Sequence, residues 1–514
     1  MTKKVFSISL SFFTLSVLYF ISRLINLTSI PVFGDEAIYI RWSQIIQTEE
    51  TLRFIPLTDG KQPLFMWIVA VFLKFIKDPL IAGRFVSVLS GFGNLFILFL
   101  LTPILLNPNK SIKDPLKHIF DSILKYYPSG IISTVFYITL PFTFFFDRLS
   151  TADNLLAFFG ISSFLLSFLL AKFPRLDLSL ILGFILGLAW LTKSPAIYFV
   201  VLSLLTFTVF NYQKIFLLFY PLISVFIAFL IYNILRLGPQ FHMIALRNQD
   251  YIWTLRDILK NPLDPFIPHL IDIYHIFVFY ISVPVLILII FTKIYLIFIR
   301  PKKLITLPVF ITIFWFILPL IANAAFAKVF TARYFLFTIM PFILALSYLL
   351  FQFLNQFKLN KAWLTLLAII FIIPNLFTIY SLSTAPFNVK LPPTENGYLN
   401  DWTSGWGIKS ASKYLIDRSK TFNVIVGTEG YFGTLPDGLQ IYTQNIPRLT
   451  VFGVGINITE IPAKLIEARD YGDDVYLLFN QSRLKLSSDQ YQNLTQIMST
   501  DKPDDDKLVL YRLN

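Results

Sequence analysis

Eleven long apolar runs occupy most of the first 383 residues of this chain. Each is long enough, or nearly so, to cross the ~30 Å hydrocarbon core of a bilayer as a helix. Because a helix satisfies its backbone hydrogen-bonding groups internally, it is the element expected in lipid. We therefore predict an α-helical polytopic membrane protein with about 11 transmembrane helices. The runs cover residues 5–25, 84–106, 127–146, 155–171, 178–192, 194–210, 215–235, 273–291, 304–326, 329–352 and 362–383.

A twelfth apolar stretch, residues 63–76, is too short for an ordinary span and favours an interfacial or re-entrant helix. The basic residues test this interpretation, because cytoplasmic loops carry an excess of Lys and Arg. If 63–76 does not cross and Lys3 and Lys4 are cytoplasmic, every later cytoplasmic loop is basic, beginning with four lysines between 110 and 125. We predict a multi-pass protein of the cell membrane with a cytoplasmic N-terminus and an uncleaved first helix.

Three regions then lie outside the membrane: two loops at 26–83 and 236–272, and the tail 384–514. The first loop is expected to hold juxtamembrane helices. The tail lacks long apolar runs and alternates β-rich segments with helical patterns, which is typical of a small α/β domain. We predict a membrane domain at 1–383 and an extracytoplasmic α/β domain at 384–514. The tail's expected strands lie near 422–427, 449–453, 475–480 and 508–513, and its expected helices near 408–418 and 460–469.

The positive net charge of the chain suggests different partners depending on which part of the chain carries it. The formal net charge is +13, from 43 Lys+Arg and 30 Asp+Glu, a balance that raises nucleic acid as a partner. The tail, however, holds 13 basic and 15 acidic residues, so the positive excess lies in the membrane part. We therefore expect the lipid bilayer as a partner and no nucleic acid. The absence of cysteine excludes a thiolate nucleophile and a Cys-ligated metal.

Charged residues at the predicted outer edge of the helices are the first candidates for function, because such groups are costly near lipid. Asp35 and Glu36 follow the first run by about ten residues. Adjacent side chains point in different directions, so one carboxylate can face a cavity while a cation holds the other. That carboxylate could accept a proton from a hydroxyl group or hold a metal. The alternative is a solvated loop or the N-cap of a helix at 37–47.

Three cations, Lys61, Lys193 and Arg333, are predicted at the same edge. A lysine there can simply snorkel to the membrane surface, whereas an arginine inside a helix end calls for an anionic partner such as a phosphate or a carboxylate. Asp153 lies near them, and Arg148 is close enough in sequence to pair with it. Together these residues predict a cavity that opens outward, with cations for a phosphate and a carboxylate for a hydroxyl proton.

Six short elements in order, spread over about residues 31–345, resemble the GT-C class of polyprenyl-phosphate-dependent glycosyltransferases. The branch is that of the protein O-mannosyltransferases and the lipid A aminoarabinose transferase. Its Asp-Glu pair, its Gly-Lys-Pro-Pro-Leu element and its Thr-Asp-x-Leu-Leu-Ala-Phe-Phe element each have a counterpart here. The elements are Asp35-Glu36, Gly60-Lys61-Gln62-Pro63-Leu64, 84–87, 148–159, 187–195 and 333–336.

The resemblance implies the GT-C fold and the transfer of one sugar, mannose-like or another hexose or pentose, from a polyprenyl-phosphate donor. The acceptor would be a protein, lipid or glycan on the outer side of the membrane, and the anomeric configuration would invert. Carried over to this chain, Asp35 would be the catalytic base and Glu36 would support it. Lys61, Lys193 and Arg333 would bind the donor phosphate, and Asp153 with Arg148 would orient the substrate.

Some features depart from the family or lie outside it. Gly60 stands where the lipid A enzyme has a glutamate proposed as a metal ligand, so we assign no metal ligand and leave a divalent metal open as the only cofactor. Residues 400–407 resemble a Trp-x-Ser-Gly element, and Trp402 and Trp406 could contact a glycan or pack the tail onto the membrane part. The loop 247–251 could line the cavity, although a solvated cap is more typical.

Two other functions remain to be weighed. A flippase or transporter for lipid-linked sugars would have inverted repeats and charges near the midplane, whereas the charges here gather at one face. An enzyme like the oligosaccharyltransferases would need an Asp-x-Asp in the first loop and a Trp-Trp-Asp element in the tail, and the sequence has neither.

Overall fold

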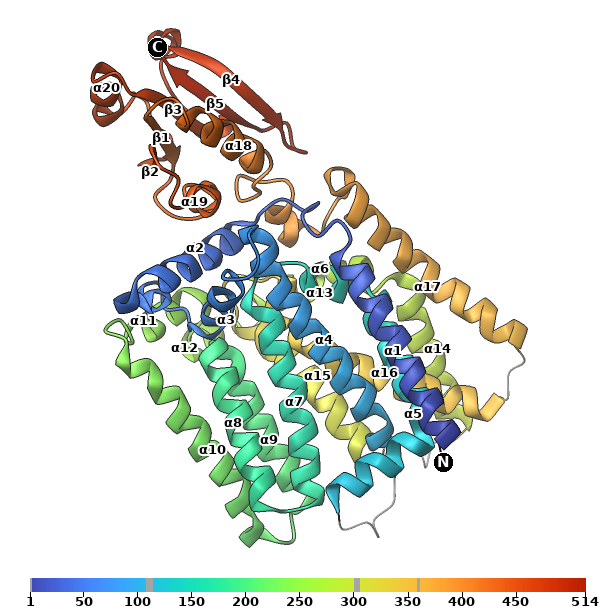
Figure 1. Ribbon diagram of the computed structural model, residues 1–514. Helices are drawn as coiled ribbons and strands as arrows, with labels where there is room; N and C mark the ends of the chain where they lie inside the picture. Colours follow the sequence, from blue (N-terminus) through green and yellow to red (C-terminus); the bar gives the residue numbers. More distant parts are fainter. Residues whose placement is uncertain (1, 108–113, 300–305, 358–360) are drawn as a thin grey trace.

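The computed structural model describes residues 2–107, 114–299, 306–357 and 361–514. A bundle of helices forms one part of the molecule, and the tail stands on one end of it, above α2 (Figure 1). The helices are α1 (Thr2–Leu24), α2 (Gly34–Thr48), α3 (Leu64–Phe72), α4 (Pro79–Leu106), α5 (Pro115–Thr139), α6 (Pro141–Asp147), α7 (Ala152–Lys172), α8 (Leu176–Thr192), α9 (Ile197–Phe210), α10 (Phe219–Tyr232), α11 (Met243–Tyr251), α12 (Leu255–Lys260), α13 (Phe266–Tyr280), α14 (Val283–Ile299), α15 (Leu307–Phe326), α16 (Leu336–Phe357) and α17 (Lys361–Thr384).

Six helices in the described ranges are long and apolar enough to cross a membrane, or up to eight if each of two bent pairs is one span. Three shorter apolar helices, Leu176–Thr192, Ser194–Phe210 and Ile369–Thr384, lie at further predicted runs. The prediction of a polytopic helical membrane protein is confirmed. Parts of the predicted basic loops, at 108–113, 300–305 and 358–360, lie outside the described residues, and the orientation in the membrane stays a prediction.

Two of the predicted runs are not single straight helices. Within 273–291, α13 and α14 meet at an angle of 103°, and within 127–146, α5 and α6 meet at 64°. Proline marks both breaks, because it lacks a backbone N–H and is favoured in the first turn of a new helix. Pro141 begins α6 and Pro284 is the second residue of α14. The expectation of a continuous span at each place was wrong.

The short apolar stretch at 63–76 forms α3, which has only nine residues. At 1.5 Å per residue this helix is about 14 Å long, less than half of a bilayer core. Phe65, Met66 and Val69 are buried against the bundle. The stretch is therefore a short helix packed beside the spans, as its length predicts.

A buried ion pair fixes the end of α1 against α5 and α6. Arg23 Nε donates to Asp147 Oδ2 at 3.0 Å, and both side chains are fully buried. Tyr19 and Tyr137 also donate their hydroxyl groups to Asp147, at 3.2 and 2.8 Å. The arginine that interrupts the first apolar run thus ties α1 to the bundle.

The tail contains a five-stranded sheet of order β2-β1-β3-β5-β4. β2, β1 and β3 are parallel, whereas β5 runs antiparallel to β3 and to β4. The α/β prediction is confirmed, although β4, α19 and α21 were missed. The elements are α18 (Ile408–Ser419), β1 (Val424–Glu429), α19 (Asp437–Thr443), β2 (Leu449–Gly455), α20 (Ala463–Asp470), β3 (Asp474–Asn480), α21 (Ser488–Gln492), β4 (Leu494–Asp501) and β5 (Lys507–Leu513).

The tail contacts the bundle chiefly through α2 and the segment before it. Gly405 N donates to Val32 O at 2.8 Å, and Gln44 Nε2 of α2 donates to Ile441 O of α19 at 2.8 Å. Figure 1 shows α19 lying directly over α2. The tail therefore contacts the segment before α2 and the second half of α2, on either side of the Asp35-Glu36 pair.

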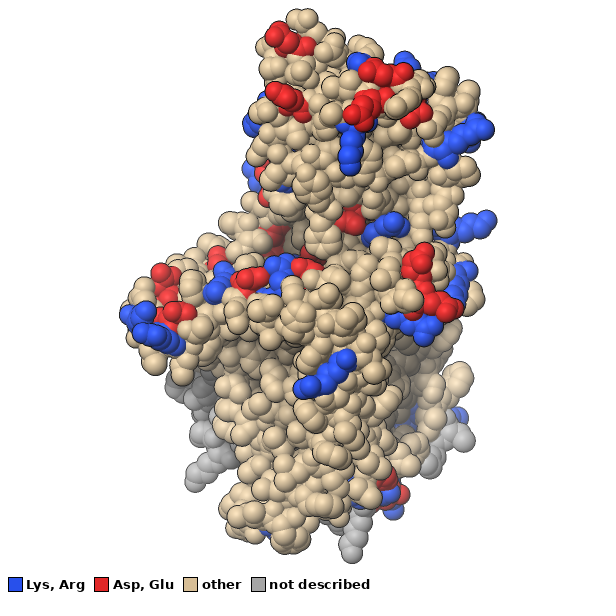
Figure 2. Space-filling model, turned by 90° about the vertical axis from the view of Figure 1, so that its left-hand side faces the viewer, with Lys and Arg blue, Asp and Glu red and all other residues tan. Residues whose placement is uncertain are grey.

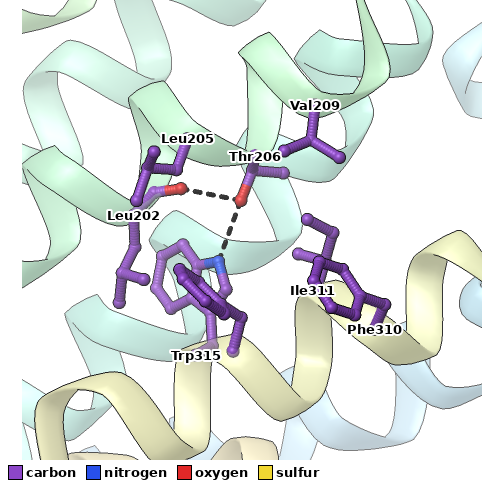
Figure 3. Close-up of a pocket in the computed structure, with 8 residues that line it drawn as sticks. Leu202, Leu205, Thr206, Val209, Phe310, Ile311 and Trp315 are labelled. Carbon is purple, nitrogen blue, oxygen red and sulfur yellow. Dashed lines mark hydrogen bonds between the residues drawn. The ribbon is translucent and has the colours of Figure 1, made fainter.

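The described surface separates charged from apolar regions. Lys, Arg, Asp and Glu gather on the tail and in a band where the tail meets the bundle, with far fewer on the visible described surface below (Figure 2). Between α9 and α15 lies a cavity of about 220 Å³, in which Trp315 Nε1 donates to Thr206 Oγ1 at 2.9 Å (Figure 3). Its lining has no ionisable side chain, whereas the charged band between the tail and the bundle has many.

Candidate active site

Glu36 is anchored at the start of α2 and is completely buried. Its two oxygens accept hydrogen bonds from Arg84 Nε and Nη2 of α4, both at 2.8 Å, and from the backbone N–H groups of Phe33 and Ser150 at 3.0 and 2.6 Å. Arg84 also donates to the carbonyl oxygens of Leu27, Ile30 and Pro31. Every polar atom of the pair is used, so Glu36 serves to hold the first loop and α2 in place.

Asp35, the adjacent residue, points elsewhere and pairs with Arg333. Arg333 lies in the short helix η6 (Ala332–Phe335) that precedes α16. The Asp35 side chain is 28% exposed and that of Arg333 is 11% exposed. The guanidinium group also lies over the rings of Phe33 and Tyr334, at 5.4 and 5.2 Å from their centroids. Asp35 is thus a partly accessible carboxylate held by one arginine.

A second ion pair joins the first turn of α7 to the residue that follows α8. Lys193 Nζ donates to Asp153 Oδ1 at 2.5 Å. Asp153 does not pair with Arg148, which was one of the arrangements that the sequence left open. Lys193 also lies over the Tyr334 ring, 4.7 Å from its centroid, so the cations of both ion pairs contact Tyr334.

Lys61, in the first loop, is the third cation of this region. Its Nζ donates to the hydroxyl oxygen of Tyr251 at 3.0 Å and lies 4.5 Å from the centroid of that ring. The rings of Tyr251 and Tyr334 meet edge to face at 6.4 Å. The three cations therefore lie on the faces of two neighbouring tyrosines, an arrangement in which cation–π attraction offsets part of their desolvation.

The pKa values show that these charges act on one another. Burial would raise the pKa of Asp35, but Arg333, Lys61 and Lys193 outweigh it and hold that pKa below its usual range. Burial lowers the pKa of Lys193, Asp153 opposes this, and the charges of Arg333 and Lys61 lower it further. Three cations thus face two carboxylates, which leaves one uncompensated positive charge among these five residues.

Arg148 is directed toward α1. Its guanidinium group donates to Ile25 O at 2.9 Å and to Asn26 O, just beyond the end of that helix. It also lies 4.7 Å from the centroid of the Phe144 ring. In these contacts Arg148 satisfies backbone carbonyl groups at the end of α1, and the structure does not join it to Asp153.

The surroundings of Gly60, the residue before Lys61, show whether a metal ligand could stand at that position. Gly60 has φ of 65°, and a Cβ atom there would lie 2.6 Å from Met243 O and 2.7 Å from Arg247 Cβ. A glutamate could not stand at this position without displacing α11. Among the described residues, no three His, Cys, Asp or Glu side chains gather closely enough to hold a metal ion. The chain therefore does not fit a metal bound through position 60.

The two tryptophans of the tail element occupy different environments. Trp406 Nε1 donates to Leu399 O at 2.7 Å, and its ring packs edge to face on Phe387 at 5.6 Å. Trp402 is 39% exposed, and Arg483 lies 4.0 Å from its ring centroid. Trp406 thus takes part in packing, whereas Trp402 is partly exposed to solvent.

Sequence reasoning underestimated three residues of this region. Tyr251 contacts Lys61, although its loop resembled a solvated cap, and Tyr334 was noted only as part of a motif. Glu395, behind Arg333, was missed entirely because it lies in a connector without apolar periodicity. An aromatic residue next to an intramembrane cation was the one signal that could have identified Tyr334.

The comparisons with known proteins identify the fold. The chain superposes on ArnT from Cupriavidus metallidurans in the apo state with a TM-score of 0.57 and 13% identity, over 99% of this chain and 98% of that one. For the same protein bound to undecaprenyl phosphate, the TM-score is 0.54 at 13% identity, over 98% and 97%. No family model and no curated protein matches the sequence. The GT-C fold that the six elements predicted is confirmed.

Proposed function

We propose that this protein is a membrane glycosyltransferase that moves a single sugar from a polyprenyl-phosphate donor to an acceptor at the tail-facing end of the helices. One observation carries the proposal: Asp35, Asp153, Lys61, Lys193 and Arg333 lie together around the neighbouring rings of Tyr251 and Tyr334. The fold supports it, because a protein of the same fold binds undecaprenyl phosphate. The sugar is a hexose or pentose, and the acceptor is a protein, lipid or glycan.

The charge balance of the group supports a phosphodiester as its ligand. Three cations and two carboxylates leave one positive charge, and a polyprenyl-phosphate-linked sugar carries one negative charge. When the sugar leaves, the phosphate gains a second negative charge, which the same cations stabilise more strongly. Interactions that strengthen toward the transition state are those that accelerate a reaction.

Asp35 is the proposed base. Because its pKa is lowered, the Asp35 carboxylate is ionised at neutral pH, and it forms an ion pair with Arg333 before substrate binds. A donor phosphate that draws Arg333 to itself would weaken this pairing and raise the basicity of Asp35. The acceptor hydroxyl then gives its proton to Asp35 as its oxygen attacks the anomeric carbon, and the bond from that carbon to the phosphate oxygen breaks. A single displacement of this kind inverts the anomeric configuration.

Binding of undecaprenyl phosphate by the protein in nanodiscs tests the phosphate site. We expect Lys61→Met to weaken this binding by about 10- to 100-fold, the effect of one lost hydrogen bond to a charged group. The substitution leaves no carboxylate unpaired, because Lys61 donates to the hydroxyl oxygen of Tyr251 while Asp35 and Asp153 keep their own partners. Lys409→Ala removes a cation at the edge of the tail that pairs with Asp78, and it should leave the affinity unchanged. Equal affinities of wild type and Lys61→Met would contradict the assignment.

A further inference from the structure

The connector between the bundle and the tail reaches behind the Asp35–Arg333 pair. It contains the short helix η8 (Pro393–Tyr398), whose Glu395 is completely buried. Glu395 Oε1 accepts a hydrogen bond from Thr331 Oγ1 and another from Ala332 N, both at 2.8 Å. Thr331 and Ala332 directly precede Arg333, so one carboxyl oxygen holds the turn that carries this arginine.

Tyr398, at the other end of η8, supports the opposite side of the pair. Its ring centroid lies 4.4 Å from that of Phe33, and Phe33 in turn lies beneath the Arg333 guanidinium group. Phe33 is also the residue before Gly34-Asp35. One connector helix therefore contacts the backbone that bears Arg333 and the ring that precedes Asp35.

The second oxygen of Glu395 has a different environment. Among the described residues, Oε2 is buried without a hydrogen-bond partner. The charged or titratable groups that face the carboxyl group are Arg333 of η6, Tyr398 of η8 and Tyr280 of α13. Burial raises the pKa of Glu395 to about 7, against the lowering effect of its hydrogen bonds and of Arg333. The carboxyl group can therefore change its charge near neutral pH directly behind the arginine.

We propose that Glu395 is a positioning residue for Arg333. By holding the turn that carries Arg333, Glu395 sets the position of the guanidinium group between Asp35 and the donor phosphate. This inference rests on the proposed function. The hydrogen bonds that Oε1 accepts fix the turn whether or not the carboxyl group is ionised, since either form accepts them. Ionisation adds a negative charge behind Arg333, so the guanidinium group attracts a phosphate less strongly as the pH rises through the pKa.

The comparison of Glu395→Gln with Glu395→Ala separates these two effects. The amide oxygen of Gln can accept the same two hydrogen bonds, so we expect near wild-type transfer, whereas Ala frees the turn and should lower kcat tenfold or more. Wild-type affinity for a polyprenyl-phosphate-linked sugar should weaken several-fold between about pH 6 and about pH 8, and the affinity of Glu395→Gln should stay flat. A phosphodiester donor is the appropriate probe because it does not itself titrate in this range.

Glu429 of β1 provides a matched control. It is a buried glutamate that accepts a backbone N–H and a side-chain amide hydrogen bond from Asn480, at 2.9 and 2.6 Å, but it lies within the tail. Glu429→Ala should leave transfer per folded protein unchanged. Thr331→Val, which removes only one of the hydrogen bonds to Glu395, should fall between wild type and Glu395→Ala, and it keeps the test decisive if Glu395→Ala does not fold.

The outcomes separate this inference from the function on which it rests. If the wild-type protein neither binds the donor nor transfers its sugar, the proposed function is wrong, and so is the positioning role that rests on it. If wild type transfers sugar and Glu395→Ala or Thr331→Val does so equally well, only the positioning role is wrong. An equal loss in Glu429→Ala, or a pH dependence of affinity that persists in Glu395→Gln, also overturns it.

Discussion

Asp35→Asn should lower the rate of sugar transfer by about 10²- to 10⁴-fold, the usual contribution of a positioned general base. Asparagine preserves the shape of the side chain but cannot take the proton of the acceptor hydroxyl. Arg333, Lys61 and Lys193 all remain, so the variant should still bind the donor. The measurement is a single-turnover assay with the purified protein and a polyprenyl-phosphate-linked sugar, together with the donor dissociation constant.

Asp59→Asn is the control for this substitution. Asp59 is 21% exposed and pairs with Arg247 at 2.5 Å, which resembles the partly exposed, arginine-paired state of Asp35. Its amide variant should transfer sugar at the wild-type rate. The pH dependence at saturating donor gives a second check: because the pKa of Asp35 is lowered, the wild-type rate of transfer from bound donor should stay high at neutral pH and fall as acid protonates the carboxylate. Wild-type transfer by folded Asp35→Asn would exclude Asp35 as the base.

Glu36→Ala should have the largest effect on stability. It leaves the Arg84 guanidinium group buried without its carboxylate and removes the acceptor of two backbone N–H groups. Removing one partner of a buried ion pair costs about 3–5 kcal/mol. We therefore expect a marked fall in the unfolding temperature of the detergent-solubilised protein, or its loss from the membrane fraction, and a similar result for Arg84→Ala.

An exposed ion pair supplies the contrast. Arg175 and Asp177 form a salt bridge at 2.7 Å, but their side chains are 50% and 54% exposed. Exposed pairs contribute little to folding, so Arg175→Ala should not change the unfolding temperature measurably. If Glu36→Ala behaves like Arg175→Ala, the Glu36–Arg84 pair is not the anchor of α2 that its burial and hydrogen bonds indicate.

The places of the charged residues could be predicted from the sequence, but their pairing could not. Lipid excludes charge, so Lys61, Lys193, Arg333, Asp35 and Asp153 had to lie near the ends of apolar runs. Which carboxylate meets which cation depends on the rotation and tilt of each helix, and these are set by packing between distant segments. Arg148 illustrates the difference: its neighbour in sequence is Asp153, yet its partners are carbonyl groups at the end of α1.

Elements without a strong periodic pattern of apolar residues also could not be predicted from the sequence. β4 has no buried residue, and its register shifts between Gln496 and Met498, so it shows no clean alternation of apolar and polar residues. The bend after Tyr280 is encoded by one proline inside an otherwise continuous apolar run, which favoured a straight span. Glu395 gains its role only from the three-dimensional contact of a connector with η6. The domain boundary near residue 384 stays a prediction.

We propose that this chain attaches one sugar to a molecule of the cell envelope, with Asp35 as the base. The most direct test is mass spectrometry of envelope molecules from cells with and without the protein. We expect an envelope molecule to lose the mass of one sugar when the protein is absent, to regain it with the wild-type chain, and not to regain it with Asp35→Asn. An unchanged envelope, or full restoration by folded Asp35→Asn, would contradict the account.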